Sequence, residues 1–248
     1  MVATPIGNLE DITLRALRTL READTIVAED TRRTRVLCQA HQIPAQLTSF
    51  HAHSSERELH ALLDALLAGK HLALVTDAGT PLVSDQGARL VRLAREHGVR
   101  VEAVPGASAV LAALAVSAIP CYAFRFVGFL PRSGQARNER LAEIVRERAA
   151  SVLFESPQRL SDTLADLQQV LSSDREIAVC RELTKLHEEV VRGPVAEVAA
   201  AFAEGARGEI TLVVAGREQD DAPELDDATL DARIDELLSA GSSVRDVA

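Results

Sequence analysis

Glycines and polar residues follow several short apolar runs in the first half of this 248-residue chain. The clearest case is "VTDAGTPLVSD" (75–85), where an apolar run ends in Asp77 and the chain turns through Gly79. Similar segments are "TPIGN" (4–8), "EDTRRT" (29–34), "HAHSS" (51–55) and "PGASA" (105–109). Glycine lets backbone approach a ligand closely, and aspartate accepts hydrogen bonds from a ribose or an amine. Each segment alone is also a good turn or helix cap. The segments predict a pocket only if several of them lie together at one edge of the same sheet.

Strand-like and helix-like stretches alternate around these segments. Apolar runs predict strands at 2–4, 25–29, 46–50, 71–76 and 99–104. Helical periodicity predicts helices at 12–20, 32–41, 56–67, 87–97 and 108–117, the last apolar nearly all round and therefore expected to be buried. This alternation is typical of an α/β fold, with a mostly parallel sheet covered by helices on both faces. Ligands of such sheets bind at the carboxyl ends of the strands, where the polar segments lie.

A break at "SAIPCY" (117–122) predicts two domains, an N-terminal α/β domain at 1–117 and a C-terminal α/β domain at 118–217. The second is expected to hold strands at 124–130, 151–155, 176–183 and 209–215, with helices at 135–149, 158–171 and 195–204. Residues 218–248 are interpreted as an acidic linker and the start of a truncated helical tail, with a helical pattern at 229–238. Most of the net charge of −10 belongs to this tail, because it holds ten acidic residues and only two basic ones.

Several functional classes lack their signatures in this sequence. It has no P-loop, no G-x-G-x-x-G after the first strand and no G-x-S-x-G nucleophile elbow. No apolar run is long enough to span a membrane, and the three cysteines have no metal or redox spacing, which favours a reduced protein of the cytoplasm. The expected pocket walls are apolar: Ile6, Leu82, Val83 and Ala109. Such walls favour a nucleoside that carries a positive charge over a triphosphate.

Eight motifs occur in an order that resembles one known family. They are "VATPIGNLEDITLRAL", "AEDTRRTRVL", "SFHAHS", "VTDAGTPLVSD", "VPGASA", "FVGFLPR", "FESPQRL" and "CRELTKLHEEVVRG". The order resembles the ribosomal small-subunit methyltransferase I family, the 16S rRNA cytidine 2′-O-ribose methyltransferases of the tetrapyrrole methylase superfamily, over residues 2–216. The resemblance implies S-adenosyl-L-methionine in a cleft between two α/β domains, 16S rRNA within the small ribosomal subunit as substrate, a homodimer and no membrane.

The same resemblance implies the residues of the cofactor pocket. Carried over position by position, they are Pro5, Ile6, Gly7, Asp77, Ala78, Gly79, Thr80, Val83, Ser108, Ala109 and Leu183.

A ribose hydroxyl is a poor nucleophile at neutral pH, so its methylation requires orientation and an acceptor for the proton. The acidic and histidine residues of the motifs are candidate bases: Glu29, Asp30, His51, His53, Glu155 and Glu182. The sequence does not choose among them. Asp30 is expected first as the cap of a helix beginning at Thr31. His51 and His53 have a possible metal spacing without a third ligand, so a loop pair or a substrate contact is the better interpretation.

Basic residues in three of the motifs are candidates for RNA binding. They are Arg32, Arg33 and Arg35, then Arg132, Arg137 and Arg140, then Arg181 and Lys185. Phosphate contacts of this kind supply most non-specific affinity for nucleic acid. The alternative is that these side chains are solvated or paired with acids, Glu29 and Glu22 in the case of the first cluster. The aromatic residues Tyr122, Phe126 and Phe129 are expected in a strand core rather than in a base-stacking platform.

Two other classes of function remain open. One is a tetrapyrrole or protein side-chain methylase of the same superfamily. The other is a non-enzymatic protein that binds RNA or nucleotides with the same fold. The motifs "AEDTRRT" and "RELTK" favour the RNA methyltransferase over both.

Overall fold

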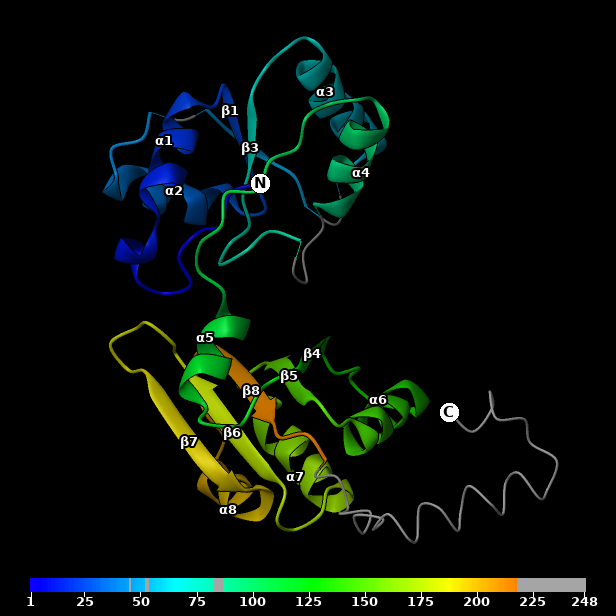
Figure 1. Cartoon of the computed structure of the whole chain (residues 1–248). Coiled ribbons are helices and arrows are strands. Elements are labelled where there is room, and N and C mark those ends of the chain that lie inside the picture. The colour runs from blue at the N-terminus through cyan, green and yellow to red at the C-terminus, as the bar shows by residue number, and fades with distance from the viewer. Residues whose placement is uncertain (45, 52–53, 83–86, 218–248) are drawn as a thin grey trace, which may run out of the picture.

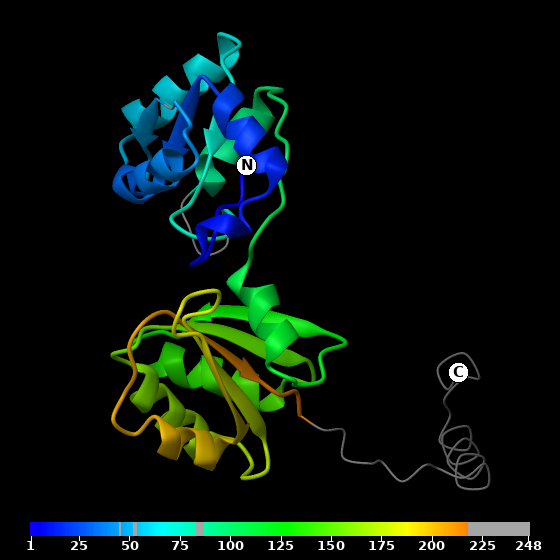
Figure 2. The same ribbon diagram turned by 90° about the vertical axis from the view of Figure 1, so that its left-hand side faces the viewer.

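The computed structural model describes residues 1–44, 46–51, 54–82 and 87–217 and shows two α/β units, one above the other (Figure 1). An extended segment leads from the first unit into the helix that begins the second (Figure 2). The predictions made for Val83, for His53 and for the tail at 218–248 lie outside the described residues. Both units are α/β, as the alternation of strand and helix patterns predicts.

The first unit is built on a three-stranded parallel sheet of order β2-β1-β3. Its strands are β1 (Thr25–Ala28), β2 (Leu47–Ser49) and β3 (Leu72–Leu74). The strands predicted at 2–4 and 99–104 are shorter than expected, because they form only isolated pairings of Val2 with Val104 and of Thr4 with Gly79. Those pairings still attach the first loop, "TPIGN", to the chain that follows β3.

Helices cover both faces of this sheet, as predicted. A 3₁₀ turn (Leu9–Asp11) precedes α1 (Leu14–Glu22), and the other helices are α2 (Thr31–Ala40), α3 (Glu56–Leu67) and α4 (Ala88–Glu96). Alternate residues of β1 point to opposite faces. Ile26 packs with residues of α1 and α2, whereas Val27 packs with residues of α3 and α4. Figure 1 shows the two helix pairs on either side of β1 and β3.

The second unit contains a five-stranded mixed sheet of order β4-β5-β8-β6-β7. The strands are β4 (Phe124–Phe129), β5 (Ala150–Glu155), β6 (Glu176–Arg181), β7 (Glu189–Pro194) and β8 (Ile210–Val214). Only β4 and β5 are parallel, and β8 pairs antiparallel with both β5 and β6. Strand β7 was not predicted; it is an edge strand that pairs antiparallel with β6.

Helices α6 (Gln135–Arg146), α7 (Leu160–Val170) and α8 (Val195–Ala201) pack on one face of this sheet around an aliphatic core. Helix α5 (Ala109–Val116) packs on the other face, where Ala113 contacts the cluster of Ala178 and Val213. The sequence assigned this helix to the first domain, but its packing partners are β5 and β8. Its expected burial holds for one side only, since Leu111 is 58% exposed and Val116 43% exposed.

Candidate active site

A cavity of about 340 Å³ lies where the two units meet, within the size range of small-molecule sites. The first unit and the start of α5 line it with Ile6, Ala78, Gly79, Thr80, Ser108, Ala109 and Val110. The second sheet and its loops line it with Phe129, Phe154, Glu155, Ser156, Pro157, Cys180, Leu183, Gly208, Glu209, Ile210 and Thr211. Seven of the predicted cofactor residues are among them, so the segments after separate strands do meet.

The turn at Gly79 explains how the backbone reaches this cavity. Its φ is +79°, a left-handed conformation that favours glycine. Its N–H and C=O both bond to Thr4, at 3.0 and 2.9 Å, which joins the first and fourth loops. A Cβ at this position would lie 3.3 Å from Ile6 Cγ2. The glycine therefore keeps one wall open for a ligand.

Pro5, Gly7 and Asp77 do not line the cavity, although they were predicted to bind the cofactor. Gly7 lies against the second unit instead, where a Cβ would be 2.8 Å from the carbonyl oxygen of Leu183. The N–H of the next residue, Asn8, donates to Thr184 Oγ1 at 3.1 Å. Gly7 thus permits a close contact between the two units beside the cavity.

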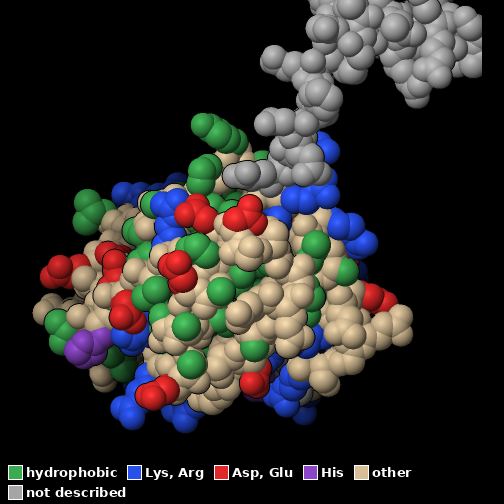
Figure 3. All heavy atoms as spheres, turned by 90° about the horizontal axis from the view of Figure 1, so that it is seen from below, with side chains coloured by type: hydrophobic (Ala, Val, Ile, Leu, Met, Phe, Trp, Pro, Cys, Tyr) green, Lys and Arg blue, Asp and Glu red, His purple; other side chains and the backbone are tan. Residues whose placement is uncertain are grey.

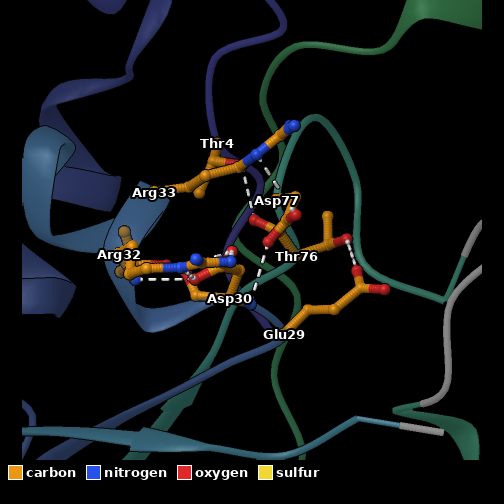
Figure 4. A network of polar contacts seen from close by, with 8 residues as sticks. Thr4, Glu29, Asp30, Arg32, Arg33, Thr76 and Asp77 are labelled. Atoms are coloured by element: carbon orange, nitrogen blue, oxygen red, sulfur yellow. Dashed lines mark hydrogen bonds and ion pairs between the residues drawn. The ribbon is translucent and has the colours of Figure 1, made fainter.

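The Asp77 carboxylate points toward the start of α2 (Figure 4). It accepts a hydrogen bond from the backbone N–H of Asp30 at 2.9 Å and pairs with Arg33 at 3.5 Å. Next to it, the Thr76 hydroxyl donates to Glu29 at 3.2 Å. These contacts hold the fourth loop against the second, so Asp77 positions the turn at Gly79 rather than facing the cavity.

Asp30 is the N-cap of α2, as the sequence predicts. It accepts a hydrogen bond from the Arg32 N–H at 2.8 Å and forms an ion pair with the Arg32 guanidinium at 2.6 Å. Hydrogen bonds from the Arg32 side chain, then from its backbone, lower the pKa of Asp30 to about 2. The Asp30 carboxylate therefore serves as the cap of α2.

Glu155, at the end of β5, is the only described candidate base that lines the cavity, and its side chain is 1% exposed. One carboxylate oxygen accepts from the Ser156 N–H at 2.8 Å and the other from the Thr163 hydroxyl at 2.7 Å. Thr163 in turn accepts from the buried Arg137, whose guanidinium also pairs with Asp166 at 2.7 Å. Glu155 is thus held as an acceptor by a buried hydrogen-bond network.

The "RELTK" loop closes the cavity with a strained backbone. Glu182 and Thr184 have φ of 52° and 66°, and Leu183 between them lines the cavity. The Glu182 carboxylate accepts from Lys185 at 2.7 Å and from the Glu209 N–H at 2.8 Å. The hydrogen bond from Lys185 lowers the pKa of Glu182 most, and the hydrogen bond from the Glu209 N–H lowers it further. Both donors bond to Oε1, so this carboxylate holds the loop shape, and Glu182 is not among the residues that line the cavity.

Most of the predicted RNA-binding residues are paired with acids in the structure. Besides Arg32 and Arg33, the pairs are Arg140 with Glu143, Arg181 with Glu189, and Lys185 with both Glu182 and Glu209. The alternative of acid pairing is thus right for these residues, but the partners of Arg32 and Arg33 are Asp30 and Asp77 rather than Glu29 and Glu22. Arg35 is exposed and makes no hydrogen bond or ion pair within the described part of the chain. The Arg32 and Arg33 side chains are 88% and 60% exposed, and ion pairs of such exposed side chains contribute little stability.

Arg137 departs from the RNA-binding prediction. It is only 7% exposed, and its three nitrogens donate to Asp166, Pro131 and Thr163. Because all these partners lie within the second unit, its guanidinium is not available to a phosphate.

Sequence reasoning missed most of the second wall. Phe129, Phe154 and the segment 208–211 belong to no ligand-binding pattern. The sequence did offer one signal, the glycine at position 208. The structure explains why a glycine stands there, since its φ is +88° and a Cβ would clash with the Glu182 side chain. The rest follows from strand pairing, because Phe129 is aligned with Phe154, and Glu155 with Ile210.

The described residues contain no group of three His, Cys, Asp or Glu side chains arranged for a metal ion. Nor does any helix among them have the length and apolarity needed to cross a membrane. The three cysteines are free, and burial raises the pKa of Cys180 at the cavity wall to about 12. That thiol therefore stays protonated and forms part of the apolar lining.

Comparison with solved structures identifies the class of fold. The cobalamin biosynthetic enzyme cobalt precorrin-4 methyltransferase aligns with a TM-score of 0.67 at 21% identity, over 86% of this chain and 92% of its own. A uroporphyrin-III C-methyl transferase from Thermus thermophilus, complexed with S-adenyl homocysteine, aligns with a TM-score of 0.62 at 23% identity, over 86% and 95%. The family of tetrapyrrole (corrin/porphyrin) methylases matches residues 1–199. The fold is that of a tetrapyrrole methylase.

Sequence relatives narrow the class. The ribosomal RNA small subunit methyltransferase I of Thermotoga maritima is 48% identical over 219 residues, 88% of this chain and 98% of its own. The protein of the same name from Mycobacterium tuberculosis is 45% identical over 246 residues, 98% and 85%. The chain belongs to the ribosomal RNA small subunit methyltransferase I family, and its cofactor is S-adenosylmethionine.

Proposed function

We propose that this protein methylates the 2′-hydroxyl of a cytidine ribose in 16S rRNA of the small ribosomal subunit. The observation that carries the proposal is the 48% identity to a ribosomal RNA small subunit methyltransferase I along nearly that protein's whole length. The cavity supports the proposal, because residues of both units line it. A site for two reactants requires walls of this kind on two sides.

The residues present fit S-adenosylmethionine. The glycine turn at 79 leaves room for a ligand beside Ile6, and the walls of Ala109 and Leu183 are apolar. Glu155 and Glu209 are the acidic residues among those that line the cavity. When bound, the cofactor supplies an activated methyl group.

The chain contributes mainly positioning to this reaction. The Asp77 contacts fix the fourth loop on one side, and the Glu155 network fixes the wall on the other. Holding two reactants in line contributes on the order of 7–11 kcal/mol to lowering the barrier in favourable cases. The apolar lining around Leu183 and Cys180 excludes water from the reacting groups.

A homodimer in the cytoplasm is part of the proposal. Helix α5 is apolar along its whole length, yet Leu111 and Val116 are 58% and 43% exposed. The chain that follows adds Tyr122, fully exposed, and Phe124, 43% exposed. Exposed apolar side chains on neighbouring elements favour a partner surface, and a second copy fits the family. Light scattering over a wide concentration range tests it, and a monomer at every concentration would contradict it.

The RNA is expected on the side of the molecule where the two units meet. The opposite face of the second unit, seen in Figure 3, carries acidic side chains among its basic ones, with Lys and Arg mainly at the rim. At the junction, Arg32, Arg33 and Arg35 follow β1 on α2, at the edge that also supports the cavity.

One assay tests the proposed function against its alternatives. Labelled S-adenosylmethionine is incubated with small ribosomal subunits, with a precorrin and with no acceptor. We expect label in the 16S rRNA alone, and digestion to nucleosides should yield 2′-O-methylcytidine. Label in the tetrapyrrole would favour the precorrin methylases that share the fold. Absence of transfer to either would favour a non-enzymatic binding protein.

A further inference from the structure

An exposed aromatic ring lies at the wall of the cavity. Phe129, the last residue of β4, is 55% exposed, although the sequence predicted it in a strand core. Its ring is 5.7 Å from that of Phe154, which packs edge-on against Phe126 at 5.0 Å. The two inner rings support Phe129 from behind. A supported ring that is open on its outer side is suited to stack against a planar ligand.

A fixed acceptor lies beside this ring at the same cavity. Each oxygen of the Glu155 carboxylate already accepts one hydrogen bond, from Ser156 N–H or from Thr163. The oxygen bonded to Ser156 also lies 3.5 Å from Arg159 Nε, so the oxygen bonded to Thr163 is the one with capacity for another donor. The Thr163 hydroxyl accepts from Arg137, so its own proton is directed at Glu155. Both carboxylate oxygens thus act as acceptors, and the group is suited to accept a hydrogen bond from a ligand.

Arg159 connects the ring to the acceptor. Its guanidinium lies 3.5 Å from Glu155 and donates to the carbonyl of Leu130, the residue after Phe129, at 2.8 Å. The same guanidinium group donates to Pro131 at 3.2 Å. The end of β4 and the end of β5 are thus fixed relative to one another by a single side chain. Such fixing is expected where a planar ligand must meet a ring and an acceptor together.

We infer that Phe129 and Glu155 form a subsite for a nucleobase that carries an exocyclic amine. The ring stacks on the base, and Glu155 accepts a hydrogen bond from its amino group, as acidic side chains do from cytosine N4. Uracil presents a carbonyl at that position, and this second acceptor cannot donate to the Glu155 oxygens. The inference rests on the proposed function. Two sources supply this chemistry: the target cytidine and the adenine of the cofactor.

Phe129→Ala tests the stacking half of the subsite, with Val170→Ala on α7 as the control. Both residues are exposed apolar residues of the second unit, at 55% and 41%, but only Phe129 lines the cavity. Loss of one base-stacking contact is expected to weaken binding about 10- to 100-fold. If the target base stacks here, methyl transfer to small subunits falls by this factor and S-adenosylhomocysteine binds with unchanged affinity in calorimetry. If adenine stacks here, the affinity for S-adenosylhomocysteine falls instead. Both results support the subsite, and Val170→Ala leaves both quantities unchanged.

Glu155→Gln tests the acceptor half. An amide both donates and accepts, so it no longer distinguishes an amino group from a carbonyl. Wild-type protein is expected to methylate subunits with cytidine at the target position at least about tenfold better than subunits with uridine there. Glu155→Gln should reduce this ratio toward one. In the adenine case, the preference for S-adenosylhomocysteine over S-inosylhomocysteine is reduced instead. Melting curves show whether the variant is folded.

Some outcomes overturn the subsite. If Phe129→Ala retains wild-type transfer and wild-type S-adenosylhomocysteine affinity, no base stacks there. Phe129 is 55% exposed, so Phe129→Ala is expected to remain folded. The test therefore holds even if Glu155→Gln does not fold. A wild-type protein that transfers no methyl to subunits contradicts the proposed function alone. In that case the subsite is tested by two binding measurements on wild type and Phe129→Ala. One measures the affinity for S-adenosylhomocysteine, and the other the affinity for cytidine monophosphate in the presence of S-adenosylhomocysteine. Unchanged affinity of the variant for both ligands would refute the subsite.

Discussion

The cavity is supported by two polar networks made of similar residues and differing in burial. In the first unit, Asp77 joins Arg33 and the Asp30 N–H, and the side chains of Asp77 and Arg33 are 26% and 60% exposed. In the second unit, Glu155 joins Thr163 and Arg137, and the side chains of Glu155 and Arg137 are 1% and 8% exposed. Both contain a carboxylate and an arginine next to a strand end.

The difference in burial separates two tasks. Water competes for the contacts of an exposed ion pair, so Arg33 can leave Asp77 for another anion at little cost. A buried network has no such substitute, and each member left without a partner carries the full penalty of desolvation. The first network is therefore suited to respond to a bound anion, and the second to hold a wall still.

The largest expected effect is on stability. Arg137→Ala leaves Asp166, Thr163 and the Pro131 carbonyl without their donor, and we expect the free energy of unfolding to fall by about 3–5 kcal/mol. Arg33→Ala should reduce it by less than about 1 kcal/mol. Urea denaturation measures both, with Arg140→Ala as a control on the same helix as Arg137. Equal losses for Arg137→Ala and Arg33→Ala would remove the distinction between the networks.

The next effect is on the cofactor. Gly79→Val places a β-branched residue at a φ of +79° and fills the space beside Ile6. We expect the affinity for S-adenosylmethionine to fall more than about tenfold, since such a backbone alone costs on the order of 1–3 kcal/mol. Asp77→Ala should also weaken it, by releasing the loop from the Asp30 N–H. Calorimetry measures the affinity of both variants for S-adenosylmethionine, with one binding site expected per chain. Unchanged affinity in both variants would place the cofactor elsewhere.

A smaller effect is expected on RNA. Changing Arg32 and Arg33 together to alanine should reduce methyl transfer to the small subunit, and the salt dependence of RNA binding should become shallower by about two phosphate contacts. Affinity for S-adenosylmethionine should change by no more than about fivefold, because Asp77 keeps its bond to the Asp30 N–H. A stable double variant with full transfer activity would show that RNA binds elsewhere, with Arg140 and Lys185 the next candidates. Joint loss of stability and cofactor binding would make the pair structural.

The smallest effect is a pH dependence of the exposed network. The pKa of Asp30 is lowered to about 2 by its bonds with Arg32, from an ordinary value near 4. A lowered pKa means that the contribution of Asp30 to stability is present above about pH 4 and is lost as the pH falls toward 2. Asp30→Asn should flatten that part of the stability curve, as followed by circular dichroism. An identical curve for wild type and variant would show that Arg32 does not hold the carboxylate in solution.

The sequence predicted every strand of the first sheet, with two further strands that form only isolated pairings, and it missed one strand of the second sheet. Alternating apolar residues such as Ile26 and Val27 belong to short parallel strands buried on both faces, which local patterns reveal. Strand β7 was missed because "EVVRGP" combines charge, glycine and proline at an edge, and only pairing with β6 makes it a strand. The placement of α5 was missed for a related reason, since its apolar sequence does not say which sheet it covers.

The same limit applies to the site. Motifs predicted loops that line the cavity, because glycines such as Gly79 have a local conformational reason to be there. Neither Phe129 nor the burial of Arg137 has a local reason. An exposed phenylalanine and a core phenylalanine are identical in sequence, and an arginine in a helix gives no sign of a partner 29 residues away. These roles arise only when α6, α7 and the second sheet are assembled.

The contacts of Glu155 also have a consequence for the order of folding. Its network joins residues 8, 26 and 29 positions apart, all between 131 and 166. The contacts of the first unit join residues 47 and 72 positions apart, from Asp30 to Asp77 and from Thr4 to Thr76. Closing short loops costs less entropy and is faster than closing long ones. During refolding, the amides of β5 and α7 should therefore gain protection from hydrogen exchange before those around Gly79, and the wall that holds the ligand would exist before the loops that enclose it.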